Sequence, residues 1–274
     1  MGDSTCNASV LVYGPSKTGK TTFVASGPRP VLILDAEGGT RFLRARKTVW
    51  SNTMMEPPKD DGTWDVCVVY VRDFSTLENT FNWLHAGAHP FRTVAIDSIS
   101  EAQQRCVDAI AGTKQMTTPD WGTLLRKISG LVRGFRDLLI HPINPLDCVA
   151  FTAMDRPKDG VHAPYLQGAI ADVLAYYLDI VVYYAVTVDE AGNGVRKMLT
   201  KPHPQFLAGD RPGMLPPVIE NPTLAAILEL SCNFDGEPLT PEASDFPDLS
   251  AFAADDSGAD APDETPDNTK ETTA

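Results

Sequence analysis

A glycine-rich segment near the start of the chain constrains its fold more than any other feature. It directly follows the apolar run Val10–Tyr13 and has the pattern G-x-x-x-x-G-K-[ST] of a phosphate-binding loop. In such a loop, backbone N–H groups surround the phosphates, the lysine reaches the β and γ oxygens, and the threonine hydroxyl binds Mg²⁺. The pattern therefore predicts a site for ATP and Mg²⁺. Its predicted nucleotide-binding residues are Gly14, Pro15, Ser16, Lys17, Thr18, Gly19, Lys20, Thr21 and Thr22.

Further apolar runs alternate with helical patterns along the chain. The runs 31–34, 66–71, 93–96 and 148–151 lack polar alternation, which is typical of strands buried on both faces. Helical patterns fall at 76–85, at 99–111, after Thr118-Pro119-Asp120 and at 221–230. Two later runs, 180–188 and 195–200, flank the turn-rich hexapeptide 189–194 and predict an antiparallel hairpin at the sheet's edge. We therefore predict an α/β fold with a mostly parallel sheet, flanking helices and this C-terminal hairpin.

The charge of the chain is concentrated at its C-terminal end. Twelve of the 36 acidic residues but only one of the 23 basic residues lie after residue 232. That segment is rich in Pro, Ser, Thr, Ala and Gly and has few large apolar residues, so it cannot offset the entropy cost of ordering. We predict one folded domain, residues 1–232, and a disordered acidic tail, residues 233–274.

Cysteine spacing and hydropathy indicate the compartment. The five cysteines are scattered without any C-x-x-C spacing, so we expect neither a disulfide framework nor a zinc site. No N-terminal segment resembles a signal peptide, and no apolar run approaches the roughly 20 residues that cross a bilayer. A soluble cytoplasmic protein without a membrane partner is the expectation.

Two carboxylates follow predicted strands that should end beside the phosphate loop. Asp97 closes the run 93–96, and we expect it to hold Mg²⁺ together with Thr21. Hydrolysis also needs a group that orients or deprotonates water, and Glu37 at the end of the second strand is the candidate, with Asp35 as the alternative. A simpler interpretation is that Asp35 or Glu37 caps the turn before Thr40.

The spacing of these motifs resembles the RecA-like recombinase core. The shared features are G-P-S-x-x-G-K-T, a second strand that closes in D-A-E and a fourth strand that closes in I-D-S. In that superfamily the glutamate of D-A-E is catalytic, which corresponds to Glu37. Segments 13–22, 35–39, 97–98, 120–122 and 151–153 together resemble the phage nucleotide-binding ATPases, several of which anneal single-stranded DNA. The similarity spans about residues 8–230 and implies an ATPase of the host cytoplasm that anneals DNA or exchanges strands.

The resemblance also implies a γ-phosphate sensor and a residue that acts on a neighbouring subunit. Thr152 stands at the sensor position, but Met154 replaces the histidine or glutamine often found slightly later. RecA-like rings and filaments place a lysine or arginine against the neighbour's γ-phosphate. Here Gly209 occupies the lysine position, so Arg211 is the candidate catalytic residue in trans. The alternative is an arginine in a turn that pairs with Asp210.

Single-stranded DNA is the partner that the resemblance implies, together with other copies of the chain and a single-strand-binding or other recombination protein. Segments 111–118 and 155–162 are the expected DNA-contacting loops, although each carries few basic residues. A denser basic stretch is interpreted as a solvated helix face, with a DNA-binding groove as the alternative; it contains Arg41, Arg44, Arg46 and Lys47. The acidic tail is either solubilising or a competitor for the basic loops. Rival functions are a nucleotide-gated assembly module and a helicase-loader-like ATPase.

Overall fold

The computed structural model describes residues 7–189 and 191–232, so the predicted acidic tail, 233–274, lies outside the described residues. The strands are β1 (Ala8–Gly14), β2 (Val31–Asp35), β3 (Lys47–Val49), β4 (Val66–Tyr70), β5 (Thr93–Asp97), β6 (Cys148–Lys158), β7 (Val161–Pro164), β8 (Ile180–Val188), β9 (Gly194–Leu199), β10 (Gly209–Asp210) and β11 (Val218–Glu220). The α-helices are α1 (Lys20–Val24), α2 (Phe74–His85), α3 (Ile99–Ala111), α4 (Thr118–Asp137), α5 (Ile170–Val173) and α6 (Leu224–Ser231). Short 3-10 helices are η1 (Gly39–Phe42), η2 (Leu138–Ile140) and η3 (Leu174–Tyr177).

The strands form a mostly parallel sheet in the order β11-β9-β8-β1-β6-β5-β2-β4-β3. All pairs from β8 to β3 are parallel, whereas β9 and β11 continue the sheet with antiparallel pairs. Strands β1, β2 and β5 are buried along their whole length, because helices cover both faces. The predicted fold class is confirmed.

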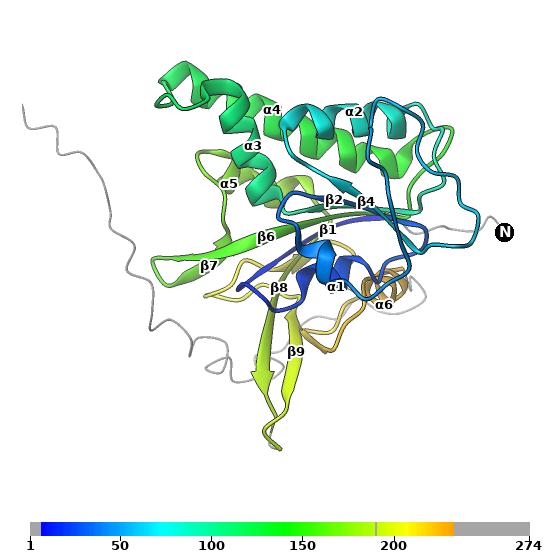
Figure 1. Ribbon diagram of the computed structural model, residues 1–274. Coiled ribbons are helices and arrows are strands. Elements are labelled where there is room, and N and C mark those ends of the chain that lie inside the picture. The colour runs from blue at the N-terminus through cyan, green and yellow to red at the C-terminus, as the bar shows by residue number, and fades with distance from the viewer. Residues whose placement is uncertain (1–6, 190, 233–274) are drawn as a thin grey trace, which may run out of the picture.

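Helices lie on both faces of this sheet (Figure 1). On one face α2, α3 and α4 pack on a core that includes Leu11 and Tyr13 of β1. On the other face α1 and α6 pack on a core that includes Val10 and Val12. The alternation follows from the strand period of two residues, which sends successive side chains to opposite faces. Among the described residues, no helix combines the length and the apolar character that a membrane crossing requires.

The long helix α4 begins where its sequence predicts, with a shift of one residue in the cap. The carboxylate of Asp120 accepts hydrogen bonds from the backbone N–H and the hydroxyl of Thr117, at 2.9 and 2.6 Å. Thr117, rather than Thr118, is therefore the N-cap, and Pro119 occupies the first turn, where it sacrifices no helical hydrogen bond.

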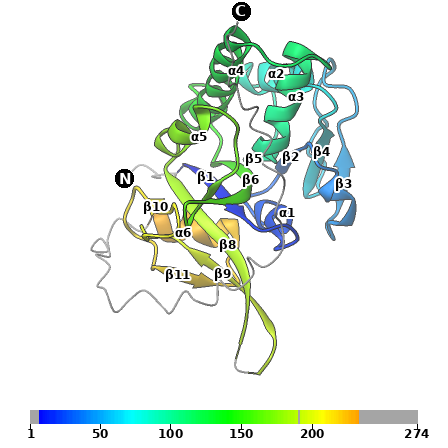
Figure 2. The same cartoon turned by 90° about the vertical axis from the view of Figure 1, so that its left-hand side faces the viewer.

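Three expectations about the periphery were wrong. The hairpin of β8 and β9 is antiparallel as predicted, but β8 lies inside the sheet beside β1, and β11 forms that edge (Figure 2). The basic stretch 41–47 is no α-helix: it runs from η1 into β3. Segment 155–162 is no loop either, because β6 extends to Lys158 and pairs with β7.

The cysteines also depart in part from expectation. Cys67, Cys106 and Cys148 are buried free thiols, as the scattered spacing predicts. Cys232, however, is disulfide-bonded. Sequence spacing alone held no signal for this bond, since a disulfide depends on which cysteines the fold brings together.

Candidate functional site

A cavity of about 650 Å³ lies at the carboxyl ends of β1, β2 and β5, with the phosphate loop along one side. The parallel register explains the convergence, since Asp35 of β2 lies level with Asp97 of β5, and Gly14 of β1 lies level with Met154 of β6. The carboxyl ends of neighbouring parallel strands form the ligand crevice in open α/β sheets. Among the predicted site residues, Lys20, Thr21, Glu37 and Asp97 line this one cavity.

Lys20, the phosphate-loop lysine, is held by the loop itself. Its ammonium donates hydrogen bonds to the carbonyl oxygens of Gly14 and Pro15, at 2.8 and 2.7 Å. Burial lowers the pKa of this ammonium, and nearby carboxylates oppose the shift. Phosphate oxygens can replace the two carbonyls as acceptors and compensate the buried charge better. The carboxylates that face Lys20 belong to Glu37, Asp97 and Asp155.

Asp97 is fixed by two hydroxyl groups. Thr21 donates to one carboxylate oxygen at 2.7 Å, and Thr152 donates to the other at 2.5 Å. Burial raises the pKa of Asp97, and both hydroxyl donors counteract that rise. A hydroxyl beside a buried carboxylate is the all-oxygen donor set that Mg²⁺ prefers, so the residues fit this ion. Thr152, the predicted sensor, is fully buried and positions Asp97; its role toward phosphate stays a prediction.

Asp35 and Glu37 have different surroundings, which separates the two candidates for water activation. The Asp35 carboxylate is buried and accepts hydrogen bonds from the backbone N–H groups of Gly38, Gly39 and Thr40, at 2.6, 3.2 and 3.0 Å. It also accepts the Thr40 hydroxyl. Asp35 therefore caps the turn into η1. The sequence had left open whether Asp35 or Glu37 caps this turn. Glu37 lines the cavity and remains exposed.

Ser98 is a site residue that sequence reasoning missed. Its hydroxyl donates a hydrogen bond to a carboxylate oxygen of Glu37 and also accepts the backbone N–H of Glu101 at the start of α3, at 3.2 Å. The cap of α3 thus fixes the orientation of Glu37. Gly39 allows the same loop to approach Thr21, because a Cβ there would lie 3.1 Å from the threonine hydroxyl. The I-D-S motif contained the serine, but nothing in the sequence indicated its partner.

Asp155 and His162 form a second pair that the sequence did not reveal. The His162 Nδ1 lies 2.7 Å from one oxygen of the Asp155 carboxylate, whose side chain is only 6% exposed. The other oxygen is buried and has no hydrogen-bond partner among the described residues. Burial raises the pKa of Asp155, opposed by His162 and by Lys20. The pairing of β6 with β7 brings these residues together, and no local motif encodes that pairing.

Arg196 of β9 contacts the phosphate loop from the hairpin side. Its Nε donates a hydrogen bond to the carbonyl oxygen of Thr18 at 3.1 Å. The next residue, Gly19, has a φ of 102°, and a Cβ there would lie 3.0 Å from the same Nε. The second glycine of the motif thus permits both the left-handed backbone and the close approach of this arginine.

Arg211 lies away from the cavity of its own chain. Its guanidinium donates to Asp179 at 2.7 Å, and Asp179 also accepts the backbone N–H of Ser9 at the amino end of β1. The phosphate loop follows the opposite end of β1, so an action of Arg211 on a phosphate requires a neighbouring subunit. The alternative pairing with Asp210 was wrong: Asp210 forms a buried ion pair with Lys201, at 3.4 Å.

The match to a family profile agrees with this geometry. The sequence profile of the family described as AAA domain matches residues 6–212. The chain belongs to the AAA domain family. A search of curated proteins found no match. Among solved structures, a KaiC-like protein from the hyperthermophilic archaeon Pyrococcus horikoshii OT3 is similar, with a TM-score of 0.39 and 15% identity, over 74% of this chain and 83% of that chain. The AAA domain of this chain thus carries a complete phosphate-loop motif at the carboxyl ends of its central strands.

Proposed function

We propose that this AAA domain binds ATP·Mg²⁺ and hydrolyses the terminal phosphoanhydride bond. The observation that carries the proposal is the convergence of Lys20, Thr21, Glu37 and Asp97 on one cavity. Thr21 and Asp97 hold Mg²⁺, which neutralises charge that develops on the phosphate oxygens. Lys20 exchanges its two loop carbonyls for β- and γ-phosphate oxygens.

Glu37 orients and deprotonates the attacking water in this mechanism. One of its oxygens accepts the Ser98 hydroxyl, which leaves the other oxygen to accept a proton from water. The water then attacks the γ-phosphorus in line with the leaving β-phosphate oxygen, so that ADP and inorganic phosphate are released.

Glu37→Gln tests this assignment. The amide keeps the shape of the side chain but cannot take the proton, so we expect turnover to fall by about 10²–10⁴-fold while ATP binding persists. Steady-state phosphate release and equilibrium binding of ATP measure the two quantities. Glu56→Gln, at an exposed position remote from the cavity in sequence, is the matched control and should retain full turnover. Near-normal hydrolysis by Glu37→Gln would overturn the role of Glu37.

A finer proposal is that turnover serves a RecA-like reaction on single-stranded DNA, annealing or strand exchange of the phage type. Its support is the sequence resemblance together with the continuity of β6, which passes from Thr152 beside Asp97 to the exposed Arg156 and Lys158. A nucleotide-gated assembly module or a helicase-loader-like ATPase is the rival. ATPase assays with and without single-stranded DNA distinguish them, because only the first proposal requires stimulation by DNA alone.

A further inference from the structure

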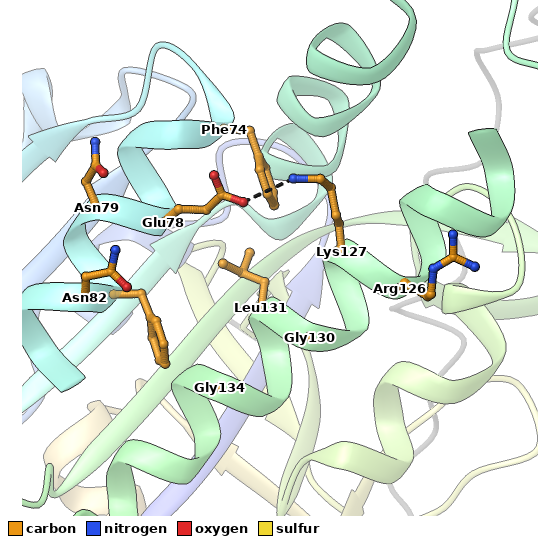
Figure 3. Close-up of a pocket in the computed structure, with 10 residues that line it drawn as sticks. Phe74, Glu78, Asn79, Asn82, Arg126, Lys127, Gly130, Leu131 and Gly134 are labelled. Atoms are coloured by element: carbon orange, nitrogen blue, oxygen red, sulfur yellow. Dashed lines mark hydrogen bonds and ion pairs between the residues drawn. The ribbon is translucent and has the colours of Figure 1, made fainter. Parts of the chain in front are cut away.

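A second cavity lies between α2 and α4, on the helical layer that covers one face of the sheet. Figure 3 shows the residues that line it. Its volume is about 550 Å³, and it shares no lining residue with the phosphate-loop cavity. Its apolar wall is made by Phe74 and Phe81 of α2 and Leu131 of α4. Phe81 is partly exposed there, whereas Phe74 and Leu131 are 3% and 9% exposed. Apolar surface that stays uncovered in a cavity can mark a place where another segment binds.

Two glycines of α4 leave its backbone accessible in this groove. A Cβ added at Gly130 would meet no atom within 4 Å, so the groove is open at that turn. At Gly134 a Cβ would lie 3.1 Å from the Phe81 ring, so this glycine lets the ring pack against the helix backbone. A peptide can therefore approach α4 closely at Gly130, with Phe81 and Leu131 beneath it.

The rim of the groove is polar and carries more positive than negative charge. Lys127 pairs with Glu78 at 3.1 Å and lies over the Phe74 ring, 5.0 Å from its centroid, as Figure 3 shows in part. Arg126 is exposed and forms no ion pair with a described residue. The side-chain amides of Asn79 and Asn82 make no hydrogen bond within the described chain, and such amides suit the N–H and C=O groups of a peptide.

The acidic tail contains a sequence that matches these properties. Its residues Phe246, Leu249 and Phe252 are spaced three apart, and no large apolar residue follows them to the end of the sequence. Asp245 and Asp248 lie in the same stretch. Purely solubilising segments are depleted in aromatic residues, so the two phenylalanines indicate a further role for this stretch. Amphipathic segments with this spacing are typical occupants of apolar grooves.

The length of chain permits contact within one molecule. Phe246 is 14 residues beyond Cys232, the last described residue, and an extended chain spans about 3.3 Å per residue, or about 46 Å. A folded domain of this size has a radius of gyration of about 17 Å. The extended stretch before Phe246 is therefore about as long as the domain is wide.

We propose that residues 246–252 bind in the α2–α4 groove of their own chain, with the aromatic rings against Phe81 and Leu131 and the aspartates near Arg126 and Lys127. This interaction is independent of the ATPase proposal and requires no nucleotide.

A disulfide cross-link in the full-length chain tests the proposal. Asn79→Cys on the groove rim is combined with Ser250→Cys in the apolar stretch, and the control combines Asn79→Cys with Thr272→Cys near the end of the tail. Docking raises the effective concentration of residue 250 at the groove, so we expect the 79–250 disulfide to form at least about tenfold faster than the 79–272 disulfide. Peptide mass analysis identifies each bond.

A groove-filling variant separates docking from chance collision. Gly130→Gln places a side chain where the backbone is now open, and glutamine is a better helix former than glycine, so folding is retained. We expect it to slow formation of the 79–250 bond to the rate of the control. Equal rates for the two cysteine pairs would overturn the proposal. So would a 79–250 disulfide that forms between two chains, one with Asn79→Cys and the other with Ser250→Cys, but not within one doubly substituted chain. An unchanged 79–250 rate in Gly130→Gln would also overturn it.

Discussion

Two buried carboxylates near the phosphate loop differ in how their oxygens are satisfied. Asp35 accepts three backbone N–H groups and a hydroxyl, so its charge is compensated by the turn that it caps. Asp155 faces His162, Lys20 and the hydroxyl of Tyr183, and one of its oxygens has no hydrogen-bond partner among the described residues. An ionised carboxylate with so few donors is destabilising when it is buried. Asp155 is therefore a residue at which stability depends on protonation.

We predict that Asp155→Asn changes the pH dependence of stability. Burial raises the pKa of native Asp155 above that of the unfolded chain, so between these two values the native state binds more protons. Stability of the original chain then falls as the pH rises through this window, by about 1.4 kcal/mol per unit of pKa difference. The amide does not titrate, so the variant should gain stability relative to the original chain as the pH rises above about 3.8, the ordinary pKa of an aspartate.

Urea unfolding across this pH range measures the difference. Asp159→Asn, at the exposed turn between β6 and β7, removes a carboxylate from the same hairpin and should leave the pH profile unchanged. If the free energy of unfolding depends on pH in the same way for Asp155→Asn and for the original chain, protonation of Asp155 does not contribute to stability.

At the scale of elements, the β6–β7 hairpin is the main departure from the sequence-based expectation. The first part of β6 is an apolar run that predicts a strand, but the stretch from Asp155 to Lys158 is polar and contains a proline. It becomes a strand because Val161–Pro164 pairs with it. Pairing between segments is a tertiary effect that local propensity does not encode, and the short strands β3, β10 and β11 were missed for the same reason.

The central strands and the site were predictable because each has a strong local signal. The phosphate loop, Asp97 and Glu37 each follow an apolar run that is buried on both faces, and parallel pairing then brings the strand ends together. Ser98, His162 and Arg196 reach the site through contacts that no motif contains.

If the hairpin contacts single-stranded DNA, its exposed cations carry the affinity. We predict that Arg156→Ala with Lys158→Ala weakens binding and lowers the salt slope by about 0.7 for each lost phosphate contact. Fluorescence anisotropy of a labelled oligonucleotide at several salt concentrations measures both. The matched control is Lys59→Ala with Arg72→Ala, two exposed cations outside the hairpin. Equal affinity and slope in both double variants would exclude the hairpin as the DNA contact.

At the scale of the whole molecule, Arg211 lies at the end of β1 opposite to the phosphate loop, where it is exposed and paired with Asp179. A head-to-tail assembly brings such opposite faces of two subunits together, as rings and filaments require. The position of Arg211 is thus compatible with action in trans and incompatible with action on the site of its own chain.

We predict that two inactive variants restore activity when they are mixed. Glu37→Gln lacks the base but supplies Arg211, whereas Arg211→Ala supplies Glu37 to a neighbour's arginine. Random assembly at equal amounts completes one interface in four, so about a quarter of the original turnover should return. Arg92→Ala, which breaks another exposed ion pair, should stay active alone. Full activity of Arg211→Ala, or no recovery on mixing, would refute the trans role.

The position of β1 between β6 and β8 has a consequence for synthesis of the chain. Residues 8–14 are synthesised well before residues 148–188, which contain both hydrogen-bonding neighbours of β1. At usual translation rates the gap lasts on the order of 10 s, during which an apolar strand has no partner on either side. The nascent chain therefore cannot assemble its phosphate loop until both β6 and β8 have been made.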